Sequence, residues 1–278
     1  MIHTGVVRGD VVEPRNESSM LDAQGAGVFV PQIRVGFVSA RVHLEAVPPV
    51  LVDVFGDRWF SQGSVSLWFE SPTVDGEPTQ VVAHRSGGRD QVEVRIERPD
   101  GSPVAIGTAA VGEPDEVSEL ERRFLVGTPD RPRRILAGVE PGDRLDAVTA
   151  ALDGTEQRRR LADAEVLGPL PWYDGDSPWG GPIATPHTEV SALAHIPTTG
   201  LRNSVEPTIV YYRAVELRHR NGPLLLDRAY RFGAQVIDVG ATDDAEMLWL
   251  RSWADDTDGR RIAEVTLLAR LVPDPAGA

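Results

Sequence analysis

Two residue types are missing from this sequence: lysine and cysteine. All 28 basic side chains among the 278 residues are arginines. Without lysine the protein cannot form a Schiff base or anchor pyridoxal phosphate. Without cysteine it has no thiol nucleophile, thiolate metal site, disulfide or iron–sulfur cluster. The side chains left for catalysis are carboxylates, hydroxyls and six histidines.

The sequence also lacks a surplus of positive charge and a long apolar run. It has 42 acidic and 28 basic side chains, a formal net charge of −14. Binding to nucleic acid or to an anionic membrane surface requires a basic face, so both partners are disfavoured. No apolar run approaches the roughly 18 residues of a membrane span, and no signal peptide is visible. We therefore expect a cytoplasmic protein, and the excess of arginine over lysine suggests a GC-rich bacterial source.

Metal and cofactor motifs are absent as well. No histidine or acidic residues occur at metal-ligand spacing, and no glycine-rich nucleotide fingerprint is present. We expect neither a metal site nor a cofactor.

The chain repeats itself. At roughly 150 residues per domain, its length predicts about two domains. Short patterns recur in the same order in the two halves: 6–12 with 139–145, 36–45 with 180–189, 65–76 with 211–222, and 100–105 with 258–263. We predict two copies of one unit, residues 1–115 and 135–278, joined by a charged, proline-containing linker at 116–134.

Each unit follows one secondary-structure plan. The apolar spacing and proline positions predict one helix per unit, at 39–55, kinked or split at Pro48 and Pro49, and at 185–196. Segments with period-two alternation follow, such as 91–97, with a hairpin signal at Asp100-Gly101. One helix followed by a long antiparallel sheet, twice, is an α+β fold.

Three features resemble a known family. They are the segment 15–23 preceding Gly36, the Gly-Pro-Ile-Ala stretch at 181–184 that opens the second helix, and the strand-like sequence pattern of 69–76. Together they resemble the MaoC-like acyl dehydratases and (R)-specific enoyl-thioester hydratases over nearly the whole chain. The resemblance implies a tandem, or double, hotdog fold, with each helix wrapped by an antiparallel sheet. It also implies a hydro-lyase acting on an acyl thioester, with coenzyme A present only as part of the substrate.

The sequence departs from this family at its catalytic pair. The resemblance implies an aspartate and a histidine, separated by four residues, before the helix. The corresponding positions in the first unit are Asn16 and Leu21, and in the second unit no histidine follows Asp174 or Asp176 at that spacing. Any catalytic site must therefore be remodelled.

A repeated His-x-Glu pattern supplies the first candidate groups. It occurs at His43 and Glu45 and again at His187 and Glu189. Positions i and i+2 on a helix lie about 200° apart, so we expect one residue of each pair to face solvent or another layer. His187 follows Pro186 in the first helical turn, where free backbone N–H groups and the helix dipole can polarise the carbonyl of a thioester. We therefore predict His187 as a general base. His43 is predicted to contact substrate. The alternative for both is a capping or packing histidine.

An acidic, aromatic loop before the second helix supplies the remaining candidates. We predict Asp176 as a base and Tyr173 as a hydrogen-bond donor. Asp174 and Trp179, together with Asn16, are predicted to line the acyl pocket, because loops on a rigid scaffold often carry binding groups. The alternative is an Asx turn with Trp179 as a packing residue.

The sequence therefore predicts a hydratase or dehydratase acting on an acyl thioester. A non-catalytic hotdog that binds a ligand or serves as a scaffold, and an acyl thioesterase, are the alternatives. The negative charge favours a coenzyme A or free small-molecule substrate over one on an acidic carrier protein. Two hotdogs in one chain already form the usual dimer, so we expect a monomer or a homodimer.

Overall fold

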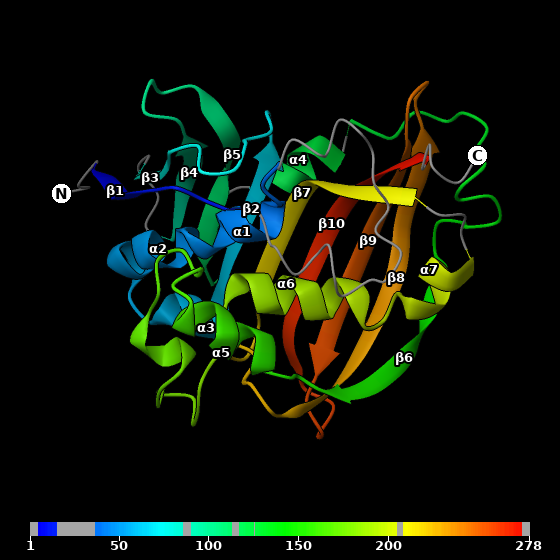
Figure 1. Cartoon of the computed structure of the whole chain (residues 1–278). Coiled ribbons are helices and arrows are strands. Elements are labelled where there is room, and N and C mark those ends of the chain that lie inside the picture. Colours follow the sequence, from blue (N-terminus) through cyan, green and yellow to red (C-terminus); the bar gives the residue numbers. More distant parts are fainter. Residues whose placement is uncertain are drawn as a thin grey trace.

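Ten antiparallel strands form a single sheet in the computed structural model (Figure 1), which describes residues 5–15, 37–85, 90–112, 117–124, 126–204 and 208–273. The strands are β1 (Val6–Val12), β2 (Gly63–Phe69), β3 (Thr79–His84), β4 (Gln91–Glu97), β5 (Pro103–Val111), β6 (Arg144–Ala151), β7 (Thr208–His219), β8 (Ala229–Ala241), β9 (Glu246–Asp255) and β10 (Arg261–Pro273). The helices are α1 (Ala40–Glu45), α2 (Val47–Phe55), α3 (Arg58–Gln62), α4 (Glu119–Phe124), α5 (Thr155–Ala162), α6 (Pro186–His195), α7 (Thr199–Ser204) and the 3₁₀-helix η3 (Pro171–Tyr173).

The strand order repeats from the two edges of the sheet inward. It is β1-β3-β4-β5-β2 in the first half and, from the other edge, β6-β8-β9-β10-β7 in the second. The halves meet where β2 pairs with β7, with Leu67 opposite Val215 near the middle. Two copies of one topology thus share one sheet. The exact division at 116–134 stays a prediction, and α4 lies within that segment.

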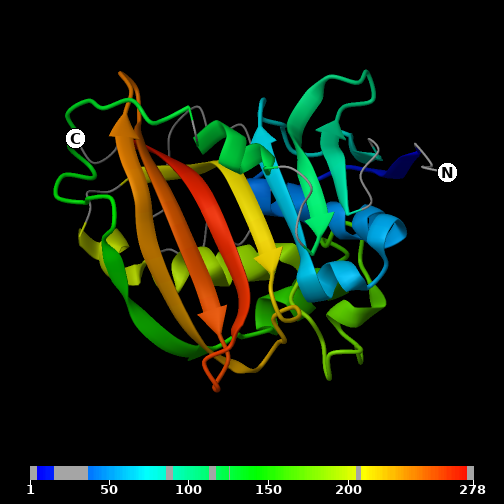
Figure 2. The same ribbon diagram turned by 180° about the vertical axis from the view of Figure 1, so that it is seen from behind.

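The helices cover the two faces of the sheet unequally. Helices α1 to α3 and α5 to α7 lie on one face (Figure 1), whereas α4 packs on the opposite face against β2, β5 and β7 (Figure 2). No helix in the described part of the chain is long and apolar enough to cross a membrane.

The helix in the first unit is broken in two. The sequence predicts a helix at 39–55 that is kinked or split at Pro48 and Pro49, and the structure shows the split: α1 ends at Glu45 and α2 begins at Val47. Pro48 and Pro49 lie in the first turn of α2, where a missing backbone donor is tolerated. The prediction for the second unit is confirmed within one residue. There Thr185 caps α6 by accepting a hydrogen bond from the backbone N–H of Thr188.

The register of the repeat differs from the one that the sequence pattern suggests. The N-caps are Ser39 and Thr185, 146 residues apart. Phe37, two residues before Ser39, and Ile183, two before Thr185, each form an isolated bridge to the segment after β2 or β7. The equivalent of His43 is therefore Glu189, and the alignment of His43 with His187 was wrong by two residues.

The first repeated pattern shifts too, because the strand equivalent to β1 is β6 at 144–151 and not 139–145. A match of a few residues between two segments does not show where a helix is capped or where a strand pairs.

One hydrophobic core runs through both units. Its members include Leu44 and Leu67 from the first unit and Val215, Leu217 and Phe232 from the second, all shielded from solvent. Burial of such side chains contributes about 1.5–3 kcal/mol each, so the two units stabilise one another.

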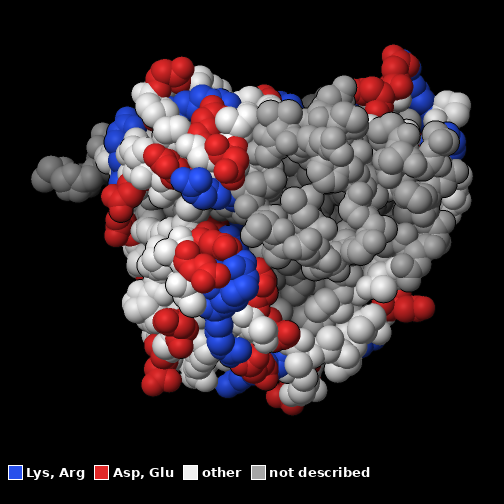
Figure 3. All heavy atoms as spheres, viewed as in Figure 1, with Lys and Arg blue, Asp and Glu red and all other residues white. Residues whose placement is uncertain are grey.

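The surface around this core carries charges of both signs. Figure 3 shows acidic and basic side chains interspersed on the described part of one face. On α5, Arg159 forms ion pairs with Glu156, Asp163 and Glu165. Arg159 thus pairs with local carboxylates, as expected for a solvated surface.

Gly107 provides a test of the packing between β5 and β2. It lies opposite Leu67, and a Cβ there would overlap the backbone carbonyl oxygen of Ser66. We expect Gly107→Ala to lower the free energy of unfolding by about 2–4 kcal/mol in urea denaturation, because backbone atoms cannot move aside cheaply. Gly200→Ala in α7 is the control, since no atom lies near its Cβ. Equal effects of the two substitutions would contradict this packing.

Candidate active site at the seam between α1 and α6

Helices α1 and α6 lie side by side and run in opposite directions (Figure 1). Arg41 Nη1 of α1 donates a hydrogen bond to Ser191 Oγ of α6 at 2.7 Å. Further along, Glu45 of α1 lies close enough to His187 of α6 for the histidine to lower its pKa. We call the contact zone between these helices the seam.

All four residues of the two His-x-Glu patterns are buried at the seam. His187 is 8% exposed, and His43, Glu45 and Glu189 are less exposed still. Within each His-x-Glu pattern the two side chains point in different directions, because positions i and i+2 on a helix lie about 200° apart. None of them faces solvent.

Glu45 forms a buried ion pair across the two units. Its carboxylate accepts two hydrogen bonds from Arg160 of α5, at 2.6 and 2.9 Å, and one from the backbone N–H of Leu167. Burial raises the pKa of Glu45, while Arg160 and His187 oppose this shift. The bidentate geometry places both carboxylate oxygens of Glu45 against the Arg160 guanidinium.

Glu189 forms a second buried pair, with His219 of β7. His219 Nε2 donates to Glu189 Oε2 at 2.9 Å, and its Nδ1 faces the carbonyl oxygen of Trp59 at 3.3 Å. The other Glu189 oxygen accepts from the backbone N–H of Leu224 at 3.1 Å. Burial lowers the pKa of His219, but the Glu189 carboxylate and the hydrogen bonds outweigh burial and raise it overall. Sequence reasoning missed His219, although the alternation of β7 places it on the same inward face as Val215 and Leu217.

His43 is enclosed in the first unit. Its Nε2 forms a hydrogen bond with Thr73 Oγ1 at 2.7 Å. Burial lowers its pKa to about 4; Glu77 opposes this shift and Arg98 adds to it. The folded protein thus holds His43 in its neutral form.

Tyr173 lies between the two buried pairs. It has no exposed surface, and its hydroxyl has no hydrogen-bond partner in the described part of the chain. Burial raises its pKa well above 10, and the carboxylates of Glu45 and Glu189 raise it further. Tyr173, Glu45, Glu189 and His187 therefore form one buried polar group at the seam, which we call the seam cluster.

Gln157 of α5 fixes this arrangement. Its Nε2 donates to the carbonyl oxygens of Tyr173 and Ile183, and its Oε1 accepts from the backbone N–H of Thr185. One side chain thus ties the loop that carries Tyr173 to the start of α6, where His187 follows.

The acidic residues of the same loop are not brought into the cluster. Helix η3 turns Tyr173 inward, whereas Asp174 and Asp176 are exposed. Trp179 is half-buried, packs against Phe60 and Trp172, and donates from Nε1 to Ser61 Oγ at 3.2 Å. The roles predicted for Asp174, Asp176 and Trp179 stay predictions, and Asn16 lies outside the described residues.

Within the described ranges, no group of three or more histidine and acidic side chains is placed to hold a metal ion. The seam itself carries imidazole, carboxylate and phenol groups.

Known proteins resemble this chain in structure but not in sequence. No protein-family model matches it, and a sequence comparison with curated proteins finds no match. A protein described as a MaoC domain dehydratase from Chloroflexus aurantiacus J-10-fl is 12% identical, with a TM-score of 0.60 over 97% of this chain and 95% of the other. A conserved Mycobacterium tuberculosis protein, described as a double hotdog essential for survival during infection, is 12% identical with a TM-score of 0.56, covering 95% and 96%. The chain has a double hotdog fold.

A third structure extends the range of activities found on this double hotdog fold. It is described as an oleoyl thioesterase from Lactobacillus plantarum, 13% identical, with a TM-score of 0.51 and 98% of both chains covered. The predicted tandem hotdog is confirmed, and a solved structure with this fold carries the MaoC description that the sequence features suggested. At such low identity the likeness establishes the fold and leaves the activity to be argued from the site.

The neutral state of His43 predicts an acid-sensitive double hotdog. As the pH falls below 6.5, the unfolded chain binds a proton at this residue before the folded protein does, so stability is lost down to about pH 4. The pKa difference corresponds to about 3 kcal/mol. His43→Gln should lose less stability than the wild type between pH 7 and pH 4.5 in urea denaturation. His84→Gln, at the end of β3, is the control and should lose stability as the wild type does; a wild-type slope in His43→Gln would refute the assignment.

The ion pair between Glu45 and Arg160 predicts strong coupling between the units. Glu45→Leu or Arg160→Leu alone should cost about 3–5 kcal/mol, because each leaves a buried charge unpaired. The double variant should cost clearly less than the sum of the two, as measured by a double-mutant cycle on the free energy of unfolding. Additive losses would show that the two side chains do not interact.

Proposed function

We propose that the protein is a hydratase or dehydratase of acyl thioesters, a hydro-lyase with a site remodelled around His187 and acting in the bacterial cytoplasm. One observation carries the proposal. His187, at the second position of α6, lies beside a Glu45 carboxylate from the other unit, in a cluster that also holds the unpartnered hydroxyl of Tyr173. Buried titratable groups without a complete set of partners are typical of functional sites.

The chemistry follows from these positions. In hydration, His187 takes a proton from water, the water oxygen bonds to the β-carbon of an enoyl thioester, and a proton is delivered to the α-carbon. Dehydration reverses these steps, with the α-proton removed and the β-hydroxyl leaving as water. Tyr173 would donate a hydrogen bond to the substrate oxygen, and the start of α6 would favour the developing negative charge.

Two solved structures with this fold support an acyl thioester as the substrate class, since one is described as a dehydratase and one as an oleoyl thioesterase. The net charge of −14 favours coenzyme A over an acidic carrier protein. We keep His43, Asp174, Trp179 and Asn16 as proposed contacts of the acyl ligand, and Asp176 as the alternative base.

Thioester hydrolysis is less well supported. A hydrolase built on these helices would use a carboxylate to attack or to activate water. Both helix carboxylates are already engaged, Glu45 by Arg160 and Glu189 by His219. The same observation favours a second candidate, a hotdog that binds an acyl ligand without turning it over.

A panel of enoyl-, 3-hydroxyacyl- and saturated acyl-coenzyme A substrates separates these functions. We expect hydration and dehydration by the wild type, and a loss of about 100-fold in kcat/KM in His187→Gln, the usual contribution of a general base. Asp176→Asn tests the alternative base and should keep its activity if His187 is the base, because Asp176 lies outside the seam cluster.

Each other outcome has a definite meaning. Full activity of His187→Gln would refute the assignment of the base, and loss of activity only in Asp176→Asn would transfer that role to Asp176. If no thioester reacts but an acyl-coenzyme A raises the Tm, the protein is a binding module.

A further inference from the structure

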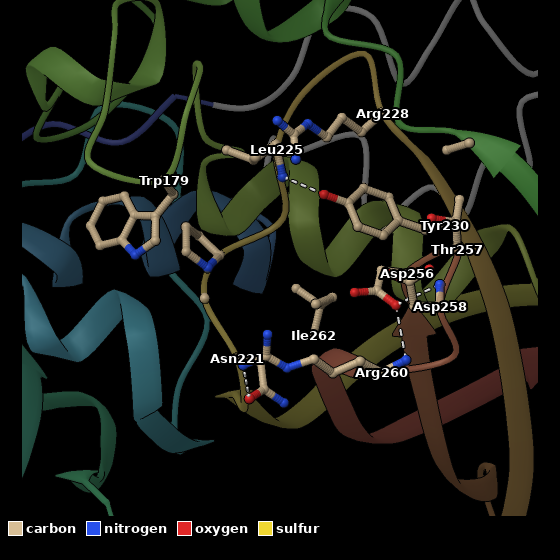
Figure 4. A pocket seen from close by; sticks show the side chains of 13 residues that line it. Trp179, Asn221, Leu225, Arg228, Tyr230, Asp256, Thr257, Asp258, Arg260 and Ile262 are labelled. Atoms are coloured by element: carbon tan, nitrogen blue, oxygen red, sulfur yellow. Dashed lines mark hydrogen bonds between the residues drawn. The ribbon is translucent and has the colours of Figure 1, made fainter.

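A pocket of about 520 Å³ lies in the second unit, away from the seam (Figure 4). It is bounded by the connection from β7 to β8, by the turn between β9 and β10, and by Trp179. Neither His187 nor Tyr173 lines it. Its volume is within the range of roughly 300–1,000 Å³ that small-molecule sites occupy.

Two arginines border this pocket from different sides. Arg228 comes from the β7–β8 connection and Arg260 from the β9–β10 turn (Figure 4). Arg260 Nη2 donates to Asn221 Oδ1 at 2.6 Å, which positions its guanidinium, and Arg228 Nη2 contacts the carbonyl oxygen of Gly180 at 3.5 Å. The described residues offer neither guanidinium a carboxylate partner. In a chain with 42 acidic and 28 basic side chains, a guanidinium without a carboxylate partner at a pocket is suited to a phosphate, which arginine binds through several donors.

Acceptor groups lie between the arginines. One oxygen of Asp256 accepts hydrogen bonds from the backbone N–H groups of Asp258 and Arg260, at 3.0 and 2.9 Å, and this holds the turn. The second oxygen has no partner among the described residues, and Figure 4 shows it on the side of the pocket. The hydroxyl of Tyr230 accepts from the backbone N–H of Leu225 at 2.8 Å, so its own proton is left to donate.

The pocket therefore combines arginines with hydrogen-bond acceptors and apolar surface, which the binding of inorganic phosphate alone would not require. A carboxylate oxygen facing the cavity repels a bare phosphate but accepts hydrogen bonds from hydroxyl groups. Asp258 also borders the pocket with an exposed carboxylate, which adds to this repulsion. Leu225, Pro223 and Ile262 supply apolar surface on which a ring can pack.

We propose that this pocket binds a phosphate monoester that also carries hydroxyl groups, either a nucleotide or a sugar phosphate. Its phosphate contacts Arg260, and its hydroxyl groups donate to Asp256 and accept from Tyr230. The site is independent of the hydratase proposed at the seam, because the two share no reacting group.

Isothermal titration calorimetry of the whole protein tests this site with 5′-AMP, ribose 5-phosphate and inorganic phosphate. We expect at least one of the two organic phosphates to bind tighter than inorganic phosphate by roughly tenfold or more, because inorganic phosphate lacks the ribose hydroxyl groups. Tighter binding of 5′-AMP identifies a nucleotide site, and equal or tighter binding of ribose 5-phosphate identifies a sugar phosphate site. Equal binding of all three, or no binding of any at millimolar concentration, would overturn the proposal.

Substitutions locate the binding. Arg260→Gln and Asp256→Asn should each weaken the preferred ligand by roughly tenfold. Asparagine keeps an oxygen for the backbone groups of the turn, so the fold is preserved, and an unchanged Tm checks this. Arg95→Gln, an exposed arginine on β4 outside the pocket, is the matched control and should bind as the wild type does. Unchanged binding in both pocket variants, or an equal loss in the control, would show that this pocket is not the site.

Discussion

The antiparallel pairing of β2 with β7 determines how the rest of the molecule is arranged. It runs from Ser64 opposite Arg218 to Trp68 opposite Ala214 and joins two five-stranded halves into one sheet. Because α1 and α6 cover the same face of their halves, this pairing brings them side by side. The hydrophobic core becomes continuous, and the seam, with its buried polar groups, exists only because the halves meet in this register.

Polar groups at such a seam must find partners from far along the chain, because they are largely shielded from solvent. Glu45 meets Arg160 and Glu189 meets His219, so each buried carboxylate is matched by a positive or protonated group. Tyr173 is left with an unmatched hydroxyl between the two pairs. The ion pairs stabilise the joined units, and in the function proposed above a substrate oxygen would accept a hydrogen bond from the unmatched hydroxyl.

Local features were the most predictable part of this protein. Pro186 and the cap at Thr185 mark the start of α6, and the alternation at 91–97 identifies β4. The repeated order of strands and helices was also visible as two similar halves. The alignment of His43 with His187 was wrong because it rested on identical residues rather than on the positions of the helix caps. The sequence pattern alone does not place a helix cap to within two residues. Pro48 and Pro49 predicted a kink or a split in the first helix, and the sequence alone did not choose between them because proline is compatible with both.

The sequence by itself determined the inventory of chemistry, in which there is no lysine or cysteine and few histidines, and it determined that one α+β unit occurs twice. Only the tertiary structure decided which of those groups meet. Arg160 and Glu45 are 115 residues apart in sequence. Tyr173 and Asp176 are neighbours in one loop, yet the first is buried and the second exposed. Spacing along the chain sets helix and strand periodicity, whereas the partner of a buried charge depends on strand register and helix packing between segments distant in sequence.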